Sequence, residues 1–231
     1  MKAVKIKNLH YKYPDGTIAL RGVDLEIEMG ESVYLIGPNG SGKSTLLLHI
    51  NGILQPQKGQ VQVLGMEVCE KTREVKRKVG LVFQNPEDQL FMPTVFEDVA
   101  FGPVNMKLGA KEVKNRVKRA LEAVGLEGFE DRSSHHLSYG EKKRVAIASV
   151  LSMEPEILVL DEPTLSLDPW IKSSFMKLLK ELGERHTMIL SGHDLGLMKL
   201  CDRTYLLDNG KIIGGVSKKG DLFKKRLTKN F

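Results

Sequence analysis

Cysteines and long apolar runs are both scarce in this sequence. Its 231 residues include two cysteines, Cys69 and Cys201, and no C-x-x-C pair. That scarcity argues against a disulfide framework or a zinc site and favours a reducing cytosol. No apolar run approaches the ~18 residues that cross a bilayer. The first residues alternate charged with apolar side chains, so they lack the apolar core of a secretory signal. We therefore expect an intracellular chain without a membrane span of its own.

Internal repeats, low-complexity linkers and the composition of a disordered chain are absent as well. Hydrophobic residues make up 41% of the sequence and charged residues 28%, which is ordinary for a globular protein. The formal net charge of +6 is concentrated after residue 210, where seven basic residues accompany one acid, Asp221. Such a tail can attract nucleic acid or an anionic membrane surface. The alternative is a solvated terminus that frays.

Strand patterns alternate with helix patterns along the chain, which predicts an α/β fold with a largely parallel core sheet. The strand-rich N-terminal region is expected to add an antiparallel β layer, and residues 86–153 an inserted helical subdomain. Residues 1–85 and 154–231 then form the core of a single domain. We predict strands at 23–28, 32–36, 61–64, 80–83, 157–160, 187–190 and 204–207, and helices at 45–50, 110–124, 144–153 and 169–182.

A glycine-rich segment between the strand at 32–36 and the helix at 45–50 matches the pattern G-x-x-x-x-G-K-[ST] of a phosphate-binding loop. Its glycines let backbone N–H groups surround phosphate oxygens, and the helix N-terminus adds partial positive charge. Lys43 is predicted to reach the β- and γ-phosphates and the Ser44 hydroxyl to bind Mg²⁺. The predicted nucleotide-binding residues are Gly37, Pro38, Asn39, Gly40, Ser41, Gly42, Lys43, Ser44 and Thr45.

Two acids, Asp161 and Glu162, follow the apolar strand at 157–160. Ligands of open α/β sheets bind at the carboxyl ends of the strands. Asp161 is therefore predicted to hold Mg²⁺, directly or through water, and Glu162 to accept a proton from the attacking water. In the alternative interpretation the pair complements the dipole of a following helix.

The order of further motifs resembles that of the ATP-binding subunits of ABC transporters, over nearly the whole chain. The phosphate loop is followed by a glutamine loop at Gln84, a signature at 137–141 and the acid pair. The segment 166–168 and His193 complete the set. The resemblance implies a P-loop NTPase core that binds ATP and Mg²⁺ and hydrolyses ATP.

The signature Leu137-Ser138-Tyr139-Gly140-Glu141 is also a capping box that opens a helix, because Ser138 is followed by Glu141 three residues later. The resemblance implies that Ser138 and Gly140 contact ATP held by a second ATPase subunit in a head-to-tail dimer. The usual family sequence is L-S-G-G-Q. Tyr139 and Glu141 depart from it, which leaves open whether the second subunit is an identical copy or a paralogue.

Three other residues acquire roles from the resemblance. Gln84 is expected to ligate Mg²⁺ and orient water, and His193 to bridge the γ-phosphate and the water. Tyr13 is placed like the aromatic residue that stacks on adenine, and Tyr11 is its rival. The other five histidines are not expected to take part.

The run Gln84-Asn-Pro-Glu-Asp-Gln-Leu-Phe91 looks like that of the subgroup serving energy-coupling-factor and cobalt/nickel importers. It implies a peripheral subunit at the cytoplasmic face of the membrane, docked on transmembrane partners, with Phe91 and Met92 either exposed as anchors or buried. A soluble ABC-type ATPase acting on nucleic acid or ribosomes is the alternative function. It is disfavoured because such proteins often carry two cassettes or a long coiled-coil insertion. A small-molecule kinase would leave the signature unexplained. We expect no nucleic acid partner.

Overall fold

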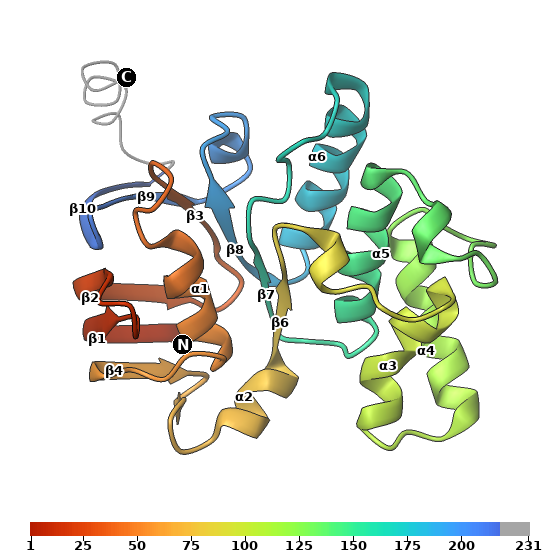
Figure 1. Cartoon of the computed structure of the whole chain (residues 1–231), viewed down its shortest axis with the longest axis horizontal. Coiled ribbons are helices and arrows are strands. Elements are labelled where there is room, and N and C mark those ends of the chain that lie inside the picture. The colour runs from red at the N-terminus through yellow and green to blue at the C-terminus, as the bar shows by residue number, and fades with distance from the viewer. Residues whose placement is uncertain (218–231) are drawn as a thin grey trace.

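The computed structural model describes residues 1–217 as two sheets and a group of helices (Figure 1). The smaller sheet is antiparallel, in the order β2-β1-β4-β5, and the larger has the order β10-β9-β3-β8-β7-β6. In the larger sheet β9, β3, β8, β7 and β6 run parallel, and β10 pairs antiparallel with β9. The strands are β1 (Lys2–Lys12), β2 (Ile18–Glu28), β3 (Ser32–Ile36), β4 (Lys58–Val63), β5 (Met66–Glu67), β6 (Val79–Val82), β7 (Ile157–Leu160), β8 (Thr187–Gly192), β9 (Arg203–Asp208) and β10 (Lys211–Ser217).

Six α-helices and three short 3-10 turns are present within residues 1–217. Helix α1 lies between the two sheets, and α3, α4 and α5 gather beyond the other face of the larger sheet (Figure 1). The helices are α1 (Lys43–Asn51), α2 (Thr72–Lys78), α3 (Val95–Asn105), α4 (Ala110–Ala123), α5 (Tyr139–Leu151) and α6 (Pro169–Gly183), and the turns are η1 (Pro86–Asp88), η2 (Ser134–His136) and η3 (Leu197–Lys199). The predicted α/β fold, with an antiparallel N-terminal layer and an inserted helical segment, is confirmed.

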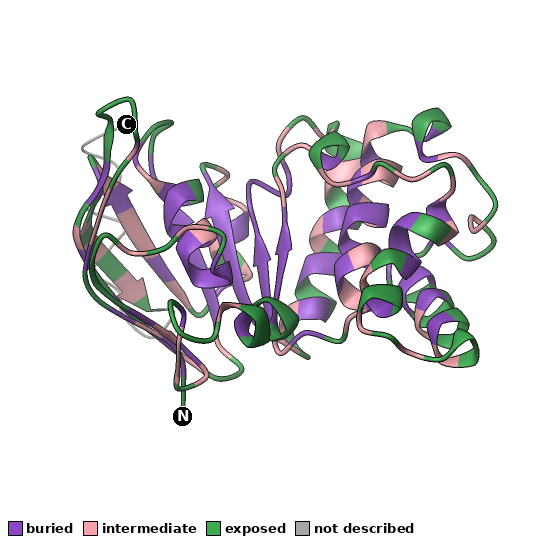
Figure 2. Cartoon of the chain, turned by 60° about the horizontal axis from the view of Figure 1, so that its bottom comes forward, coloured by how far each residue is buried: buried purple, intermediate pink, exposed green. Residues whose placement is uncertain are grey.

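Alternate residues of the central strands enter two separate cores. Val33 and Leu35 of β3 pack with α1 and the antiparallel sheet, whereas Tyr34 and Ile36 pack on the side of the helices. Successive side chains of a strand point to opposite faces, so a strand covered on both faces is apolar throughout. All five residues of β3 are buried, and the central strands are uniformly purple in Figure 2. This burial fixes the sheet against which the loops of the site are held.

Residues 83–156, all of them described, contain helices and turns but no strand. A complete capping box starts α3, with Thr94 and Glu97 exchanging hydrogen bonds, and another starts α5, with Ser138 and Glu141 doing the same. The capping box predicted at Ser138 is thus confirmed. We retain 86 and 153 as the proposed boundaries of the helical subdomain within a single domain of residues 1–231.

Several predicted boundaries differ from the structure. The predicted helix 45–50 begins at Lys43, because the last two loop residues already belong to its first turn. The predicted helix 144–153 begins at Tyr139, since the capping box starts it, and ends at Leu151. The strand predicted at 61–64 stops at Val63, where Leu64 turns with φ 51°.

The start of the basic tail was predicted to be a solvated, fraying end or a binding arm, but Lys211–Ser217 form β10 against β9. The other basic residues of the tail lie at 218–231, outside the described residues.

Candidate nucleotide-binding site

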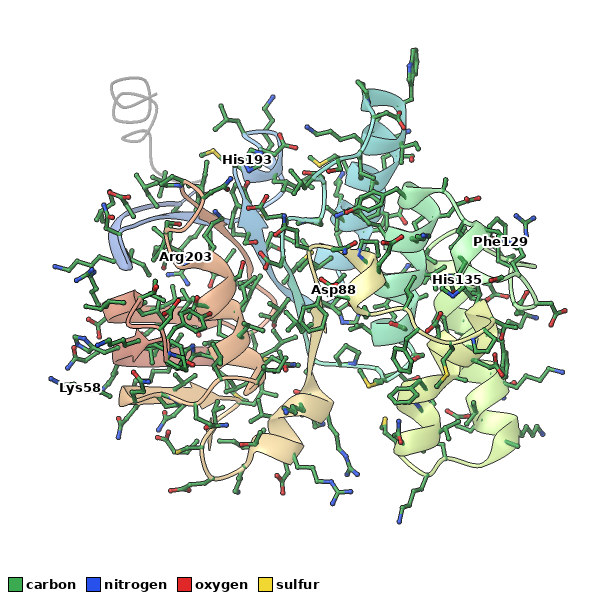
Figure 3. All side chains as sticks on the ribbon, viewed as in Figure 1. Lys58, Asp88, Phe129, His135, His193 and Arg203 are labelled. Atoms are coloured by element: carbon green, nitrogen blue, oxygen red, sulfur yellow. The ribbon has the colours of Figure 1, made fainter. Side chains whose placement is uncertain are left out.

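Four loops meet at one edge of the larger sheet. Strands β3, β8, β7 and β6 are neighbours and parallel, so their carboxyl ends lie together, as in other open α/β sheets. The phosphate loop follows β3, His193 follows β8, the acid pair follows β7 and Gln84 lies two residues after β6. Figure 3 shows His193 beyond the end of β8, whereas His135 lies among the helices. Sequence positions more than 150 residues apart thereby share one site.

The phosphate loop needs two of its glycines for contacts with other parts of the chain. A Cβ on Gly37 would lie 2.1 Å from the carbonyl oxygen of Leu207, and one on Gly42 would lie 2.5 Å from that of Ala19. Gly42 also has φ 103°, a conformation that favours glycine. It is the N-cap of α1 and leaves that helix without a side-chain cap. Backbone N–H groups at the start of α1 are therefore available to an anion such as a phosphate.

Lys43 turns back over the loop that precedes it. Its Nζ donates hydrogen bonds to the carbonyl oxygens of Gly37 at 2.9 Å and Pro38 at 3.1 Å, and lies 3.5 Å from Oε1 of Glu162. Only 5% of the Lys43 side chain is exposed. The ammonium is thus held at the mouth of the loop, where a charged hydrogen bond to a phosphate oxygen is strong.

Glu162 lies at the centre of the polar contacts in the site. Its Oε1 faces Lys43, and its Oε2 lies 3.3 Å from Nδ1 of His193. Its backbone N–H donates to Oγ of Ser191 at 3.0 Å, and Ser191 Oγ–H donates to Oδ1 of Asp161. Both acids are 8% exposed.

The alternative in which the acid pair complements a following helix is wrong, because no helix begins there. Turns follow Glu162, and α6 begins only at Pro169 with Asp168 as its N-cap.

A pocket of about 420 Å³ joins most of the predicted residues. Tyr13 lies on its wall, with its hydroxyl 3.0 Å from Oγ1 of Thr45. Tyr11 does not line the pocket. It packs edge-to-face against Tyr13 and His49 instead, at centroid distances of 5.0 and 4.7 Å. The predicted residues that line the pocket are Tyr13, Asn39, Gly40, Gly42, Lys43, Ser44, Thr45, Gln84, Glu162 and His193.

Some predicted residues do not line this pocket. Gly37, Pro38 and Ser41 belong to the loop but are not among the residues that line the pocket, and Asp161 is turned toward Ser191. Oγ of Ser41 is buried without a hydrogen-bond partner.

Ser138 and Gly140 begin α5, where a Cβ on Gly140 would lie 2.8 Å from Ile171 of α6. The single chain therefore does not bring its signature to its own phosphate loop.

The residues predicted to bind metal offer oxygen donors. Ser44 has a hydroxyl, Gln84 an amide and Asp161 a carboxylate, and Mg²⁺ prefers a few such ligands together with waters and substrate phosphates. Within residues 1–217, no three His, Cys, Asp or Glu side chains are grouped as a metal site. The donor set therefore fits a Mg²⁺ carried by a phosphate ligand better than a resident cation.

Sequence reasoning missed several neighbours of the site. Thr17, Ile18, Ala19 and Leu165 line the pocket but belong to no motif. Ser191 links Asp161 and Glu162. It is a polar residue directly after the apolar stretch 188–190 of β8, and this change of polarity could have marked it in the sequence. A second pocket, of about 650 Å³, includes Arg116, Pro155 and Arg185 and none of the predicted residues.

Known proteins resemble this chain in sequence. The sequence model of the ABC transporter family matches residues 20–165 of this chain. The energy-coupling factor transporter ATP-binding protein EcfA of Methanocaldococcus jannaschii is 53% identical, over 92% of this chain and 78% of that protein. EcfA of Methanococcus maripaludis is 51% identical, over 93% of this chain and 79% of that protein.

Solved structures give the same result. CbiO1 of Clostridium perfringens, described as part of the ABC transporter complex cbiONQ, has a TM-score of 0.85 at 41% identity and covers 94% of this chain and 88% of its own. The ATP-binding cassette MJ0796, a dimer with bound ADP and Pi in a post-hydrolysis state, has a TM-score of 0.85 at 31% identity, with 94% and 99% coverage. Together with the geometry of the loops, these likenesses show that the chain belongs to the ATP-binding, ATP-hydrolysing subunits of the ABC transporter family.

Proposed function

We propose that this chain hydrolyses MgATP in the 420 Å³ pocket and that Glu162 is the general base. The observation that carries the proposal is the position of Glu162, whose carboxylate lies between Lys43 and His193 on the pocket wall. A carboxylate there can accept a proton from water that attacks a γ-phosphate. Phosphoryl transfer otherwise depends on positioning and on stabilisation of charge.

The other predicted residues take supporting roles in this proposal. The loop from Gly37 to Thr45 and the free N-terminus of α1 bind the phosphates, with Lys43 neutralising negative charge. Tyr13 stacks on adenine, and Gln84 and His193 orient water. Ser44, Gln84 and Asp161 hold Mg²⁺, which neutralises charge on the phosphate oxygens when it is bound.

We further propose that Ser138 and Gly140 complete the site of a second ATPase subunit. Both lie at the N-terminus of α5, where backbone N–H groups favour an anion, and neither lines the pocket of its own chain. A related cassette forms a dimer. A two-fold dimer would place each signature against the other subunit's phosphate loop and create two equivalent sites.

The proposed role in the cell is to power import through a membrane transporter of the energy-coupling-factor or cobalt/nickel kind. The names of the EcfA relatives and of the cbiONQ complex support transmembrane partners over the alternative of a soluble ATPase acting on nucleic acid or ribosomes. No helix within residues 1–217 is long and apolar enough to cross a bilayer. The proposal therefore places this subunit peripherally, at the cytoplasmic face of the membrane.

An exposed aromatic pair is the proposed docking point for the membrane partner. Phe91 is 60% exposed and packs edge-to-face against Phe101, which is 44% exposed, at a centroid distance of 5.0 Å. The backbone N–H groups of Phe91 and Met92 both donate to Oδ1 of buried Asp98 at 3.0 Å, so the loop is held firmly. The alternative that Phe91 is buried is wrong, whereas Met92 is half-buried. Rigid exposed aromatics suit the apolar face of a partner's helix.

Glu162→Gln tests the catalytic proposal. The amide has nearly the same shape but cannot accept a proton, so hydrolysis should fall by at least about 100-fold. ATP affinity, measured by calorimetry, should remain within about threefold of the unmutated value, since binding loses no phosphate contact.

Glu156→Gln is the matched control. Glu156 lies just before β7, whereas Glu162 lies just after it, and Glu156 pairs with Lys78 at the surface. Its variant should retain full turnover. Unchanged hydrolysis in Glu162→Gln would show that another group is the base.

A further inference from the structure

Lys143 is a buried lysine whose ammonium contacts two loops of the site at once. It lies on α5, and only 3% of it is exposed. Its Nζ donates to the carbonyl oxygen of Gln84 at 3.1 Å and to that of Glu162 at 3.2 Å. One carbonyl follows β6 and the other follows β7. A single side chain from the signature helix thus connects the backbones of the glutamine loop and of the proposed base.

Burying this ammonium is costly. Removal from water lowers the pKa of Lys143 to about 8, although the charges of Glu162 and Asp161 favour the protonated form. A buried charge is retained at such a cost only when hydrogen bonds compensate it, and an apolar side chain of similar length would fill the space more cheaply. The ammonium therefore contributes more than packing between α5 and the sheet.

Glu162 has a backbone conformation that requires support. Its φ is 43°, in the left-handed region, which is unfavourable for a non-glycine residue. The N–H of Glu162 donates to Ser191, and its carbonyl oxygen accepts from Lys143 and from the backbone N–H of Leu165 at 3.1 Å. These bonds fix the peptide groups on both sides of the Cα that carries the carboxylate, and the bond from Lys143 is the one that comes from α5. Strain at functional sites persists where the surroundings hold it in this way.

Other contacts also join α5 to the glutamine-loop region. Nζ of Lys142 lies 2.6 Å from Oε1 of Glu87, and Nε2 of Gln89 donates to the carbonyl oxygen of Ala146 at 2.8 Å and to Oγ of Ser149 at 3.0 Å. These contacts reach the segment that follows β6. Lys143 differs from them because it also reaches Glu162.

From these contacts we propose that Lys143 is a positioning residue for hydrolysis, which holds the backbones of Glu162 and Gln84 in register with the signature helix. The inference rests on the proposed role of Glu162 as the base. Lys143 itself does not line the pocket, so it acts through Glu162 and not on the nucleotide. Movement of α5 would be passed to Glu162 through the hydrogen bond that Lys143 donates to its carbonyl oxygen.

The test compares Lys143→Met with the unmutated chain. Methionine has a similar length but donates no hydrogen bond, so the Glu162 backbone keeps its bonds to Ser191 and Leu165 and loses the one that connects it to α5. We expect kcat to fall between about 10- and 100-fold, because small misplacements of a catalytic group have effects of that size. The dissociation constant for ATP should stay within about threefold of the unmutated value. Thermal denaturation should show a folded chain, because the lost charge was costly to bury.

Ser152→Ala is the matched control. Oγ of Ser152 is also buried on the same helical segment and donates to a backbone carbonyl, that of Val99, at 2.8 Å. It does not line the 420 Å³ pocket, and its hydrogen bonds go to the carbonyl oxygens of Val99 and Ser149 and not to either loop. Its loss should lower stability slightly and leave kcat unchanged. If Lys143→Met does not fold, Lys143→Gln is measured in its place. Glutamine retains a donor on a shorter side chain, so the loss of kcat should be smaller than the loss expected for methionine.

A double variant separates this inference from the proposed function. In single-turnover hydrolysis, Glu162→Gln with Lys143→Met should be no slower than Glu162→Gln alone, because no base remains to be positioned. An unchanged kcat in Lys143→Met, an equal loss in both backgrounds, or a parallel loss of ATP affinity would overturn the role of Lys143. Full activity of Glu162→Gln would instead overturn the assignment of the base.

Discussion

Nζ of Lys43 lies 3.5 Å from Oε1 of Glu162, and both side chains are buried. A buried lysine and glutamate that face one another each compensate the charge of the other. In this chain the lysine belongs to the phosphate loop and the glutamate to the end of β7, so the pair joins the two halves of the proposed site. A phosphate ligand would approach the same ammonium. Binding of ATP and the position of the proposed base are therefore coupled through Lys43.

Lys43→Ala should weaken ATP binding at least about tenfold, because it removes a charged hydrogen-bond donor to the phosphates. MgATP hydrolysis should fall to near background. The variant also leaves Glu162 buried without its cation, so thermal stability should fall. Calorimetry and phosphate release measure the two functional effects. Lys58→Ala, at an exposed position of β4, is the control and should behave like the unmutated chain. Normal turnover in Lys43→Ala would remove the phosphate loop from the proposed site.

Mixing two inactive variants should restore activity if the site is shared between subunits. Lys43→Ala disables the phosphate loop, and Ser138→Arg disables the signature. A mixed dimer has one site with both lesions and one with neither, so an equal mixture should recover about a quarter of the unmutated rate when subunits pair at random. The assay is run with ATP, at concentrations where the unmutated chain is dimeric.

The control for this mixture is Thr94→Arg, because Thr94 forms a capping box at α3 just as Ser138 does at α5. Loss of a cap costs about 1 kcal/mol in either helix, but only the loss at Ser138 should abolish hydrolysis. Mixtures that stay inactive at every ratio would contradict a shared site in a homodimer.

Replacing Phe91 and Met92 by serine should impair assembly with the transmembrane partner and leave ATP hydrolysis by the isolated subunit unchanged. Phe91 is exposed and its loss uncovers little of the core, so the variant should fold. Co-purification from membranes measures assembly. Ile213→Ser removes a comparably exposed apolar residue from β10 and should assemble normally. Intact assembly of the double variant would mean that the partner docks elsewhere.

Stability should fall as the pH is lowered below about 6.5, the ordinary pKa of histidine. Burial lowers the pKa of His49 in the folded chain, although its hydrogen bond to the carbonyl oxygen of Thr45 acts in the opposite direction. The unfolded chain therefore binds a proton at a higher pH than the folded chain does, and acid favours unfolding. Burial also lowers the pKa of His186, so this histidine adds to the loss of stability in acid.

The melting temperatures of the unmutated chain and of His49→Phe, compared at pH 7.5 and 5.5, check this expectation. The ring of phenylalanine keeps the contact with Tyr11 and cannot be protonated, so the loss of stability on acidification should be smaller in the variant. An identical loss in His49→Phe would assign the effect to other groups.

The features predicted correctly from the sequence are those with local causes. The phosphate loop, the buried strand β7 and the capping box at Ser138 each depend on neighbours within a few residues, so their patterns are complete in the sequence. Helix α3 and strand β10 are among the elements that were not predicted. Gly102 and Pro103 in α3 and Gly214 and Gly215 in β10 weaken their local signals.

The sequence by itself thus determined the fold class, the residues available for phosphate chemistry and the order along the chain of the strands that carry them. The tertiary structure decided which candidates meet. It put Tyr13 and not Tyr11 on the pocket wall, brought Glu162 between Lys43 and His193, and connected Lys143 to both loops. These contacts join residues that are 19 to 119 positions apart or depend on which face of a strand a side chain occupies. Their physical cause is the parallel packing of β3, β8, β7 and β6, which places the carboxyl ends of distant strands at one edge.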